Sequence, residues 1–434
     1  MRVTFYTLGC KVNQNETGAL AQLFEENGYT VVSNEESADV YIVNSCTVTN
    51  FGDQKSRKWL RRAKRENPGA VTVLTGCYPQ AFPEEAAEIA EADVVTGSGN
   101  RRAILADVQK VLDGEAERVV DIRPHEKGER FEELPMDKFA EHTRAFVKVE
   151  DGCNRRCAYC VIPRARGPVR SRDEASILDE LRRLADAGYK EVVLTAISLP
   201  SYGTDSGTSL AELIEKAAAV PGIERIRLGS LDPDMLHDED IRRMAAVKKL
   251  CPQFHLSLQS GCDKTLRAMR RPYTTAQYAE IADKLREAFG AENVSFTTDV
   301  IVGFPGETEE DFEASMAFVT GQRFLKVHVF PYSRREGTPA YDFPGQLPEH
   351  EKEDRSRRMT AAVEKVRAAK VAAMQGRTAS VLLETPLSAT LFTGYTKQYL
   401  PVLVSAPGHK TGDIVNAMLG AWDGRRCRAE IVEK

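Results

Sequence analysis

The chain has 434 residues, of which 42% are hydrophobic and 28% are charged, and its formal net charge is −5. This length predicts two or three domains, and the composition is that of a globular protein that is not basic throughout. Because no apolar run is long enough to span a bilayer and the first residues lack the apolar core of a signal peptide, we expect a cytoplasmic protein without a membrane partner.

Residues 1–117 alternate short apolar runs with amphipathic stretches. Such alternation predicts an α/β domain built on an open parallel sheet. The expected strands are Val3–Leu8, Val40–Asn44, Val71–Thr75 and Val94–Thr96, and the expected helices are Thr17–Asn27, Asp53–Glu66, Glu84–Glu91 and Arg102–Leu112. Residues 118–142 are rich in charge and show little periodicity, so we expect a linker or a surface strand there.

Three cysteines follow the expected strands of this first domain. Cys10 comes after the first strand, Cys46 after the second and Cys77 after the third, and each is preceded by Gly or Ser. Sites in open α/β sheets form at the carboxyl ends of strands, so we expect these cysteines to converge at one edge. The alternative is three buried core thiols, although core cysteines would more naturally lie inside the strands.

The alternation restarts at residue 143 and continues to about residue 335. About six strand–helix units are too few for a closed eight-stranded barrel, so we expect a partial one. The expected strands are Ala145–Val149, Glu191–Thr195, Arg225–Leu228, Phe254–Leu258, Ser295–Ile301 and Lys326–Val329, and the expected helices are Ser176–Ala187, Leu210–Ala219, Glu239–Ala246, Thr275–Glu287 and Glu309–Thr320. A long charged helix over Gln346–Gln375 should complete the domain 143–375.

The last segment, 376–434, changes character. Its strand-like runs include Ala379–Leu383, Tyr399–Val404 and Ile414–Leu419, and Gly and Pro separate them. Short strands at this spacing predict a small antiparallel β-barrel of about 60 residues.

The most informative motif is a C-x3-C-x2-C run formed by Cys153, Cys157 and Cys160 directly after the expected strand Ala145–Val149. Closely spaced thiolates suit zinc or an iron–sulfur cluster. A structural zinc site needs four ligands, and no histidine lies nearby to provide the fourth. Three thiolates around a four-iron cube leave one iron open for another ligand. An incomplete zinc knuckle or three unrelated cysteines is the alternative.

The spacing, with Tyr159 inside it, resembles the signature of the radical S-adenosylmethionine (SAM) enzymes. Over nearly the whole chain, the sequence is similar to the methylthiotransferases of that superfamily. The matching motifs are LGCKVNQNE at Leu8, NSCTVT at Asn44, TGCYPQ at Thr75, GCNRRCAYCVIPRARG at Gly152, LSLQSG at Leu256, MRRPYT at Met269, TDVIVGFPGET at Thr298 and HVFPYSRREGTPA at His328. The resemblance implies an N-terminal cluster domain, a partial (β/α)6 radical SAM barrel and a C-terminal TRAM barrel.

The resemblance also implies cofactors and site residues. One 4Fe-4S cluster would be bound by Cys153, Cys157 and Cys160 and would cleave SAM. A second, bound by Cys10, Cys46 and Cys77, would deliver sulfur. Residues expected near SAM are Tyr159, Ala196, Ser230, Gln259, Asp299, Val302 and Phe304. Ala196 stands where the family usually has Gly, and a methyl group there would shift the SAM position slightly.

Within the family, LGCKVN and FPYSRREGTPA are similar to the branch that converts N6-threonylcarbamoyladenosine, beside the tRNA anticodon, to its 2-methylthio derivative. The alternatives are isopentenyl-adenosine tRNA and an aspartate of ribosomal protein S12. A non-catalytic, zinc-stabilised RNA-binding protein is the alternative of another class. The implied partners are the tRNA anticodon stem-loop, a low-potential electron donor and a sulfur source.

Clustered basic residues indicate where RNA would lie, because cations give affinity for phosphates rather than sequence readout. The expected RNA contacts are Arg57, Arg61 and Lys64 on a helix, and Arg164 and Arg166 after the cysteine loop. Arg334 and Arg335 are the expected partners of the threonylcarbamoyl carboxylate. Taken singly, each basic run is more typical of a solvated face.

Overall fold

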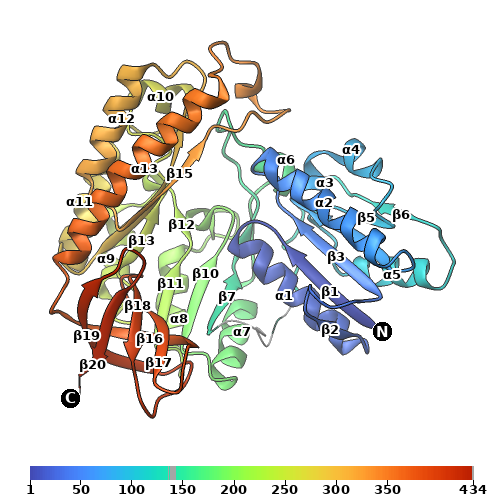
Figure 1. Ribbon diagram of the computed structural model, residues 1–434, viewed down its shortest axis with the longest axis horizontal. Coiled ribbons are helices and arrows are strands. Elements are labelled where there is room, and N and C mark those ends of the chain that lie inside the picture. The colour runs from blue at the N-terminus through green and yellow to red at the C-terminus, as the bar shows by residue number, and fades with distance from the viewer. Residues whose placement is uncertain (135, 137–142, 433–434) are drawn as a thin grey trace.

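The computed structural model describes residues 1–134, 136 and 143–432. Residues 135 and 137–142 of the expected linker, and 433–434 at the end of the expected last domain, lie outside the described residues. Figure 1 shows an N-terminal α/β unit in blue, a central open barrel from green to orange and a small red β-barrel. Of the described helices, none is long and apolar enough to cross a membrane.

The N-terminal unit contains one six-stranded parallel sheet in the order β2-β1-β3-β4-β5-β6. Its strands are β1 (Arg2–Thr7), β2 (Thr30–Val32), β3 (Val40–Ser45), β4 (Val71–Gly76), β5 (Val94–Thr96) and β6 (Val119–Asp121). The four expected strands are present, which confirms the parallel sheet. The two edge strands β2 and β6 were not among them; unlike the fully buried β5, which is equally short, they are only partly buried.

The helices of this unit are α1 (Lys11–Glu26), α2 (Asn50–Glu66), α3 (Cys77–Ala81), α4 (Pro83–Ala87) and α5 (Ala103–Leu112). Helix α1 begins six residues before the expected Thr17–Asn27. Its first turns carry Asn13 and Asn15, residues that favour turns over helices, which the structure buries with polar partners. The expected helix Glu84–Glu91 is shorter, and α3 precedes it.

The central unit is an open barrel of two parallel sheets, β11-β10-β7 and β12-β13-β14-β15, adjoining through a parallel bridge between Ile226 and Leu250. This arrangement confirms the partial barrel. Its strands are β7 (Arg144–Lys148), β10 (Glu191–Thr195), β11 (Arg225–Leu228), β12 (Ser230–Leu231), β13 (Gln253–Leu256), β14 (Ser295–Val302) and β15 (Lys326–Pro331). A small ladder pairs β8 (Glu150–Asp151) with β9 (Arg170–Ser171) beside the cysteine loop.

The barrel is covered by α7 (Glu174–Asp186), α8 (Leu210–Ala219), α9 (Asp238–Ala246), α10 (Asp263–Ala268), α11 (Thr275–Phe289) and α12 (Glu309–Gly321), and α6 (Ile162–Arg166) follows the cysteine loop. One hydrophobic core joins strands to helices; for example, Val193, Phe254 and Phe312 are fully buried in it. Single 3-10 turns span Leu199–Ser201, Pro233–Met235 and Pro339–Asp342.

Helix α13 (Glu349–Ala372) packs against β15 and leads to the closed C-terminal barrel, which has the order β16-β17-β18-β20-β19. Its strands are β16 (Thr378–Pro386), β17 (Leu391–Thr396), β18 (Pro401–Ser405), β19 (Ile414–Trp422) and β20 (Cys427–Ile431). The expected small barrel is confirmed, with one difference from the antiparallel expectation: β18 and β20 pair in parallel. Alternating residues such as Val381, Leu383 and Val402 fill its core.

The C-terminal barrel docks at the amino ends of β10 and β11 through buried charges. Glu191 accepts hydrogen bonds from Arg227 at 2.9 Å and Arg225 at 3.3 Å. Arg227 also donates to the carbonyl of Lys397 at 3.0 Å, and Arg225 donates to the Ser380 hydroxyl at 2.8 Å. The arginines thus join Glu191 in the central unit to the backbone and side chains of the barrel.

We predict that Glu191→Gln lowers the free energy of unfolding by about 3–5 kcal/mol, because it leaves buried guanidinium groups without their counter-charge. Calorimetric or denaturant unfolding would measure the loss. The matched control is Glu212→Gln, which removes one partner of the exposed ion pair with Lys216 and should leave the transition unchanged. Equal transitions for the two variants would contradict the structural role of Glu191.

Candidate active site

Cys10, Cys46 and Cys77 follow β1, β3 and β4, three neighbouring strands of the sheet. The loops approach one another closely at two glycines. Gly9 has φ +105°, and a Cβ atom there would lie 2.8 Å from Cys46 Cβ. Gly76 has φ +97°, and a Cβ atom there would lie 2.5 Å from Asn44 Oδ1. A side chain at either position would collide with the neighbouring strand end. The close approach of the loops therefore requires glycine before Cys10 and before Cys77.

The three thiols lie within electrostatic reach of one another. Burial, followed by the neighbouring thiols of Cys77 and Cys10, raises the pKa of Cys46 to about 12. Burial also raises the pKa of Cys77, although Arg166 opposes the shift. The raised pKa values keep Cys46 and Cys77 protonated at neutral pH as free thiols, so a bound metal would have to supply the stabilisation of their thiolates.

The second group of cysteines lies in the loop between β8 and α6. Gly152 has φ +89°, and a Cβ atom there would lie 1.9 Å from the carbonyl oxygen of Pro168, so the loop turns tightly. The Cys153 amide donates to the Gly167 carbonyl at 3.0 Å. The Arg271 guanidinium donates to Cys157 Sγ at 3.3 Å. Mainly because of burial, the pKa of Cys153 is raised to about 11 and that of Cys160 to about 12.

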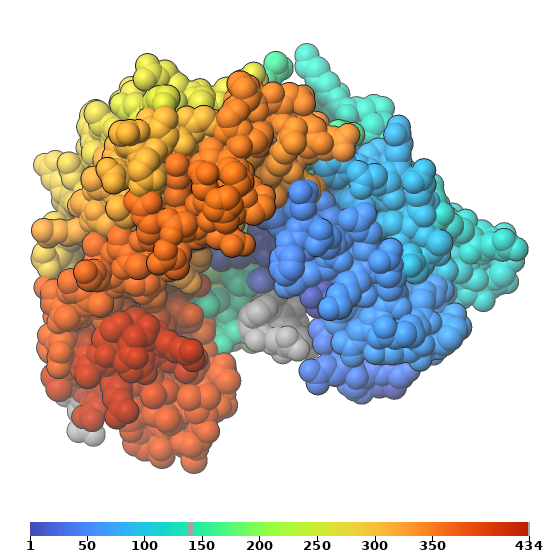
Figure 2. Space-filling view, turned by 45° about the horizontal axis from the view of Figure 1, so that its top comes forward, coloured from blue at the N-terminus to red at the C-terminus, as the bar shows by residue number. Residues whose placement is uncertain are grey.

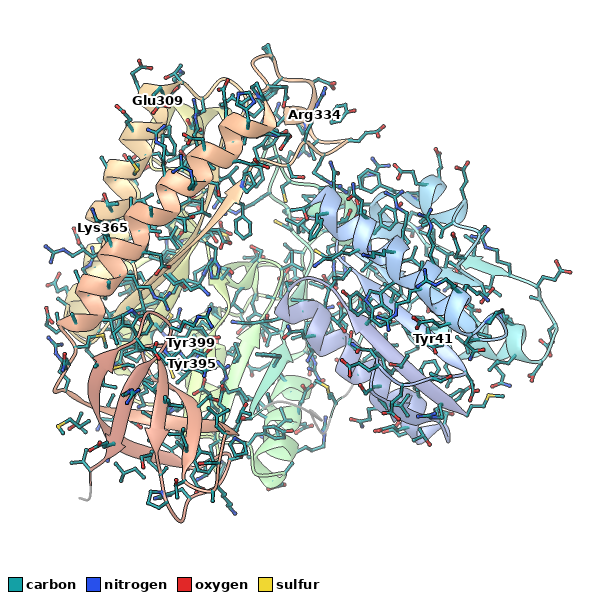
Figure 3. All side chains as sticks on the ribbon, in the orientation of Figure 1. Tyr41, Glu309, Arg334, Lys365, Tyr395 and Tyr399 are labelled. Atoms are coloured by element: carbon teal, nitrogen blue, oxygen red, sulfur yellow. The ribbon has the colours of Figure 1, made fainter. Side chains whose placement is uncertain are left out.

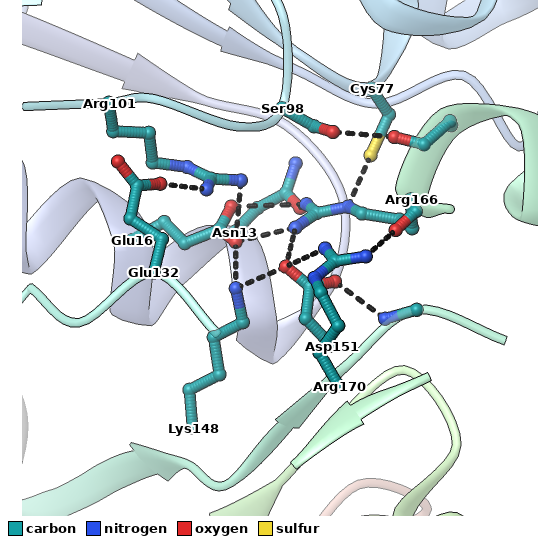
Figure 4. A network of polar contacts seen from close by, with 12 residues as sticks. Asn13, Glu16, Cys77, Ser98, Arg101, Glu132, Lys148, Asp151, Arg166 and Arg170 are labelled. Atoms are coloured by element: carbon teal, nitrogen blue, oxygen red, sulfur yellow. Dashed lines mark hydrogen bonds and ion pairs between the residues drawn. The ribbon is translucent and has the colours of Figure 1, made fainter. Parts of the chain in front are cut away.

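The segment that follows the cysteine loop packs against the N-terminal cysteine group. Cys77 lies in one hydrophobic cluster with Val161 and Ala165, and Val161 directly follows Cys160. Arg166, at the end of α6, donates from Nε to Cys77 Sγ at 3.1 Å (Figure 4). The edge of the N-terminal sheet therefore faces the cysteine loop of the central barrel.

The donor set fits cysteine-ligated iron–sulfur clusters better than zinc. Within the described ranges, no three His, Cys, Asp or Glu side chains are grouped so that they could hold one metal ion. A tetrahedral zinc site requires its ligands to converge on a single point. In a four-iron cube each cysteine binds a different iron, so the sulfurs need no such convergence. Both groups consist of cysteine thiols, and an arginine donates to one sulfur of each, so their donor chemistry fits clusters ligated by thiolates.

A cavity of about 500 Å³ lies where the three units meet. Cys10, Lys11 and Gln14 line it from the N-terminal unit, and Tyr395 and Tyr399 line it from the C-terminal barrel. Its other walls come from the central strands and α13. Figure 2 shows a hollow between the N-terminal and C-terminal parts of the chain, and Figure 3 shows the two tyrosines on the side of the red barrel that faces the centre.

Of the residues expected near SAM, Ala196, Ser230 and Asp299 line this cavity. Tyr159 is half-buried and packs against the cluster of Ala158 and Met269 behind the cysteine loop. Gln259 has φ +71° and bridges to Val300 through its backbone. Val302 and Phe304 require a correction: each is only 1% exposed and lies in a hydrophobic core, so neither side chain lines a binding surface.

The basic residues expected to contact RNA differ in their exposure and in whether they pair with an acidic side chain. On α2, Arg57, Arg61 and Lys64 turn toward the following segment and pair with Glu85 at 4.0 Å, Glu91 at 3.0 Å and Asp93 at 2.6 Å, respectively. The exposed cations of that helix include Lys55, Lys58 and Arg65. Arg164 is exposed over the Phe82 ring, and Arg334 is exposed over the Tyr341 ring, so both remain available to a partner.

Arg166 and Arg335 also require correction. Arg166 is fully buried, with Glu16 and Cys77 as partners, and cannot reach a phosphate. Arg335 is 3% exposed and binds Asp53 at 2.7 Å and the Thr47 hydroxyl at 2.6 Å. It therefore supports the loop that carries Cys46 instead of presenting a charge to a substrate carboxylate. Sequence alone does not distinguish an arginine in the interior from one on the surface.

The polar residues of the cavity that the sequence reasoning missed include Lys11, His255, His328 and Arg367. His255 Nε2 lies 3.3 Å from Asp299 Oδ2. The signal for Lys11 was present, since it directly follows Cys10 in a matching motif. Arg367 comes from the middle of a charged helix, where nothing in the pattern separates it from its neighbours.

Comparisons with known proteins agree with this site. A model of the radical SAM superfamily matches residues 147–319, and a model of the uncharacterized protein family UPF0004 matches residues 2–97. TsrM from Kitasatospora setae, a radical S-adenosylmethionine methyltransferase, is similar in fold, with a TM-score of 0.57 and 16% identity over 78% of this chain and 73% of that chain. The fold and the cysteine loop define a radical SAM enzyme, so one 4Fe-4S cluster and SAM are its cofactors.

Close relatives narrow the class. Threonylcarbamoyladenosine tRNA methylthiotransferase MtaB of Bacillus subtilis is 38% identical over 96% of this chain and 93% of that protein. The MtaB protein of Aquifex aeolicus is 41% identical over 82% of this chain and 86% of that protein. The tRNA-2-methylthio-N(6)-dimethylallyladenosine synthase of Clostridium novyi is 36% identical over 98% and 95%. The chain belongs to the MtaB-like radical SAM methylthiotransferases and is a transferase.

The raised pKa values predict slow alkylation of the cysteines in cluster-free protein, because the thiolate is the reactive form. At pH 8, a pKa of about 12 for Cys46 and Cys160 leaves about a thousandfold less thiolate than the ordinary value of 9.0. Mass spectrometry after timed iodoacetamide treatment should find exposed Cys10 labelled first. Labelling of Cys160 as fast as Cys10 at this pH would contradict the burial described.

Proposed function

We propose that this enzyme converts N6-threonylcarbamoyladenosine in tRNA to its 2-methylthio derivative, using two 4Fe-4S clusters. One observation carries the proposal: the segment that follows the cysteine loop of the central barrel packs on Cys77 of the N-terminal unit, so two groups of three cysteines, from separate units, lie on adjoining elements. The relatives named MtaB support the same activity.

The clusters would supply the hydrogen abstraction at an unactivated C–H bond and the sulfur, which side chains cannot provide. Cys153, Cys157 and Cys160 would ligate the cluster that binds SAM, and Cys10, Cys46 and Cys77 the one that carries sulfur. The protein's own contribution is to position the base and to exclude water. Ala196 and Ser230, at the ends of central strands, offer backbone and hydroxyl groups to SAM.

The charge of the cavity favours a substrate with an anionic substituent. Lys11, Lys326 and Arg367 line it, and Asp299, a carboxylate of the same wall, lies beside His255. The threonylcarbamoyl group carries a carboxylate, whereas an isopentenyl group is apolar and would leave these cations unpaired. Because Lys11 also adjoins Cys10, it replaces Arg335 as the candidate partner of that carboxylate.

Sequence identity does not decide the substrate, since relatives named for dimethylallyladenosine are nearly as similar as those named MtaB. Modification of isopentenyl-adenosine tRNA or of ribosomal protein S12 is therefore an outcome that the assays must test. The partners in this proposal are the tRNA anticodon stem-loop, a low-potential electron donor and a sulfur source, and the expected compartment is the cytoplasm.

Reconstituted protein should hold about eight irons, as two four-iron clusters require. Replacing Cys153, Cys157 and Cys160 by Ala should remove about half of them and abolish SAM cleavage. Replacing Cys10, Cys46 and Cys77 should remove the other half while reductive SAM cleavage continues without sulfur transfer. Iron and sulfide analysis together with product detection would measure both. About one zinc per chain and no sulfide would favour the non-catalytic RNA-binding protein instead.

Side-by-side assays should show turnover of tRNA carrying threonylcarbamoyl-adenosine and none of tRNA carrying isopentenyl-adenosine. Lys11→Met should raise KM for the first tRNA by about tenfold or more, because a hydrogen-bonded ion pair contributes roughly 1.5–3 kcal/mol.

The matched control is Lys326→Met, an exposed lysine of the same cavity, which should change KM less than Lys11→Met does. Turnover of isopentenyl-adenosine tRNA or ribosomal protein S12 alone would overturn the substrate assignment. An unchanged KM for Lys11→Met would overturn only the role of Lys11.

A further inference from the structure

A buried network of ion pairs joins the N-terminal unit to the cysteine loop of the central barrel (Figure 4). Arg166 lies at its centre and is fully buried. Its Nη1 lies 2.5 Å from Glu16 Oε1, its Nη2 donates to Asn13 Oδ1 at 2.7 Å, and its Nε donates to Cys77 Sγ at 3.1 Å. All three nitrogens of this guanidinium therefore have partners in the N-terminal unit.

The surrounding charges fix the orientation of Arg166. Glu16 also binds Arg101 at 2.7 Å and Lys148 at 2.7 Å. Lys148 pairs with Asp151, two residues before Cys153, at 2.5 Å. Arg101, Arg166 and Lys148 outweigh the effect of burial and lower the pKa of Glu16 to about 2, so this carboxylate is ionised. A guanidinium held by an ionised carboxylate has little freedom to turn away from the sulfur.

A neutral thiol is a weak acceptor, whereas a ligating thiolate accepts a charge-assisted hydrogen bond. The buried guanidinium edge 3.1 Å from Cys77 Sγ would therefore form a stronger hydrogen bond with a thiolate than with a neutral thiol. The same segment that provides Cys160 provides Arg166, six residues later on α6. The central barrel thus contributes a cation to a cysteine of the other unit.

We propose that Arg166 is a positioning residue for Cys77: it orients the thiolate for ligation and raises the reduction potential of the cluster bound there. The inference rests on the second cluster of the proposed function. Hydrogen bonds and positive charge at ligating sulfurs stabilise the reduced, more negative form of an iron–sulfur cluster. Removal of the donor should make that cluster harder to reduce.

The test uses the full-length chain with Cys153, Cys157 and Cys160 replaced by Ala, so that iron binds only at the N-terminal group. Arg166→Met removes the donor and the charge, and Arg166→Lys keeps the charge. The matched control is Arg101→Met, because Arg101 is 2% exposed and binds Glu16 as Arg166 does, and it also pairs with Glu132. Iron content, circular dichroism and a redox titration followed by electron paramagnetic resonance are measured for each.

Arg166→Met should shift the midpoint potential to more negative values by at least 59 mV, a tenfold change in a one-electron equilibrium. Arg101→Met should shift it less, and Arg166→Lys should lie between. Equal potentials in Arg166→Met and Arg101→Met would overturn the proposal.

If Arg166→Met does not fold, Arg166→Lys decides the case, and an unshifted potential there would overturn the proposal. If the folded Arg166 variants lose iron and the Arg101 variant keeps it, the positioning role of Arg166 is supported. Equal loss of iron from the Arg101 variant overturns that role. The parent triple variant separates a failure of this inference from a failure of the proposed function. If the parent binds no iron, the second cluster and the proposed function are both rejected. If the parent binds iron and Arg166→Met leaves its midpoint potential unchanged, only the role of Arg166 is rejected.

Discussion

Parallel strands all end at the same edge of a sheet, and this constraint determines where the chemistry of the molecule lies. β1, β3 and β4 are neighbours, so the residues that follow them are brought together although they are 31 to 67 positions apart in the sequence. Gly9 and Gly76 then allow the loops to approach closely. The cysteine loop of the central barrel meets this edge from the opposite side.

Desolvated ion pairs fix how the three units meet. Glu16 and Arg166 hold the N-terminal unit to the cysteine loop. Arg225 and Arg227, paired with Glu191 inside the central unit, donate hydrogen bonds to the C-terminal barrel. Removing one partner of such a pair is costly because it leaves a buried charge uncompensated. Junctions of this kind favour a single relative placement of the units, which a site assembled from all three requires.

The sequence was sufficient to predict the regular strands and the convergence of the N-terminal cysteines at one sheet edge. It was insufficient to predict which charged side chains are buried. Strands such as Glu191–Thr195 are buried on both faces and stand out as apolar runs bounded by turns, so their limits were predicted correctly. The short edge strand β2 is only partly buried and does not form such a run. Arg166 and Arg335 were mistaken for surface residues, because the pattern along a chain does not reveal partners such as Glu16 that are 150 positions away.

The two cysteine groups differ in how much of the chain must fold before they exist. Cys153, Cys157 and Cys160 lie within eight residues, so a single loop brings them together. Cys10, Cys46 and Cys77 meet only when three strands have paired, and their arrangement depends on contacts distant in sequence, which form slowly. Under the proposed function, iron can bind at the N-terminal group only after the sheet is complete, and a chain damaged at β3 would keep the local cysteine loop while losing the distributed group.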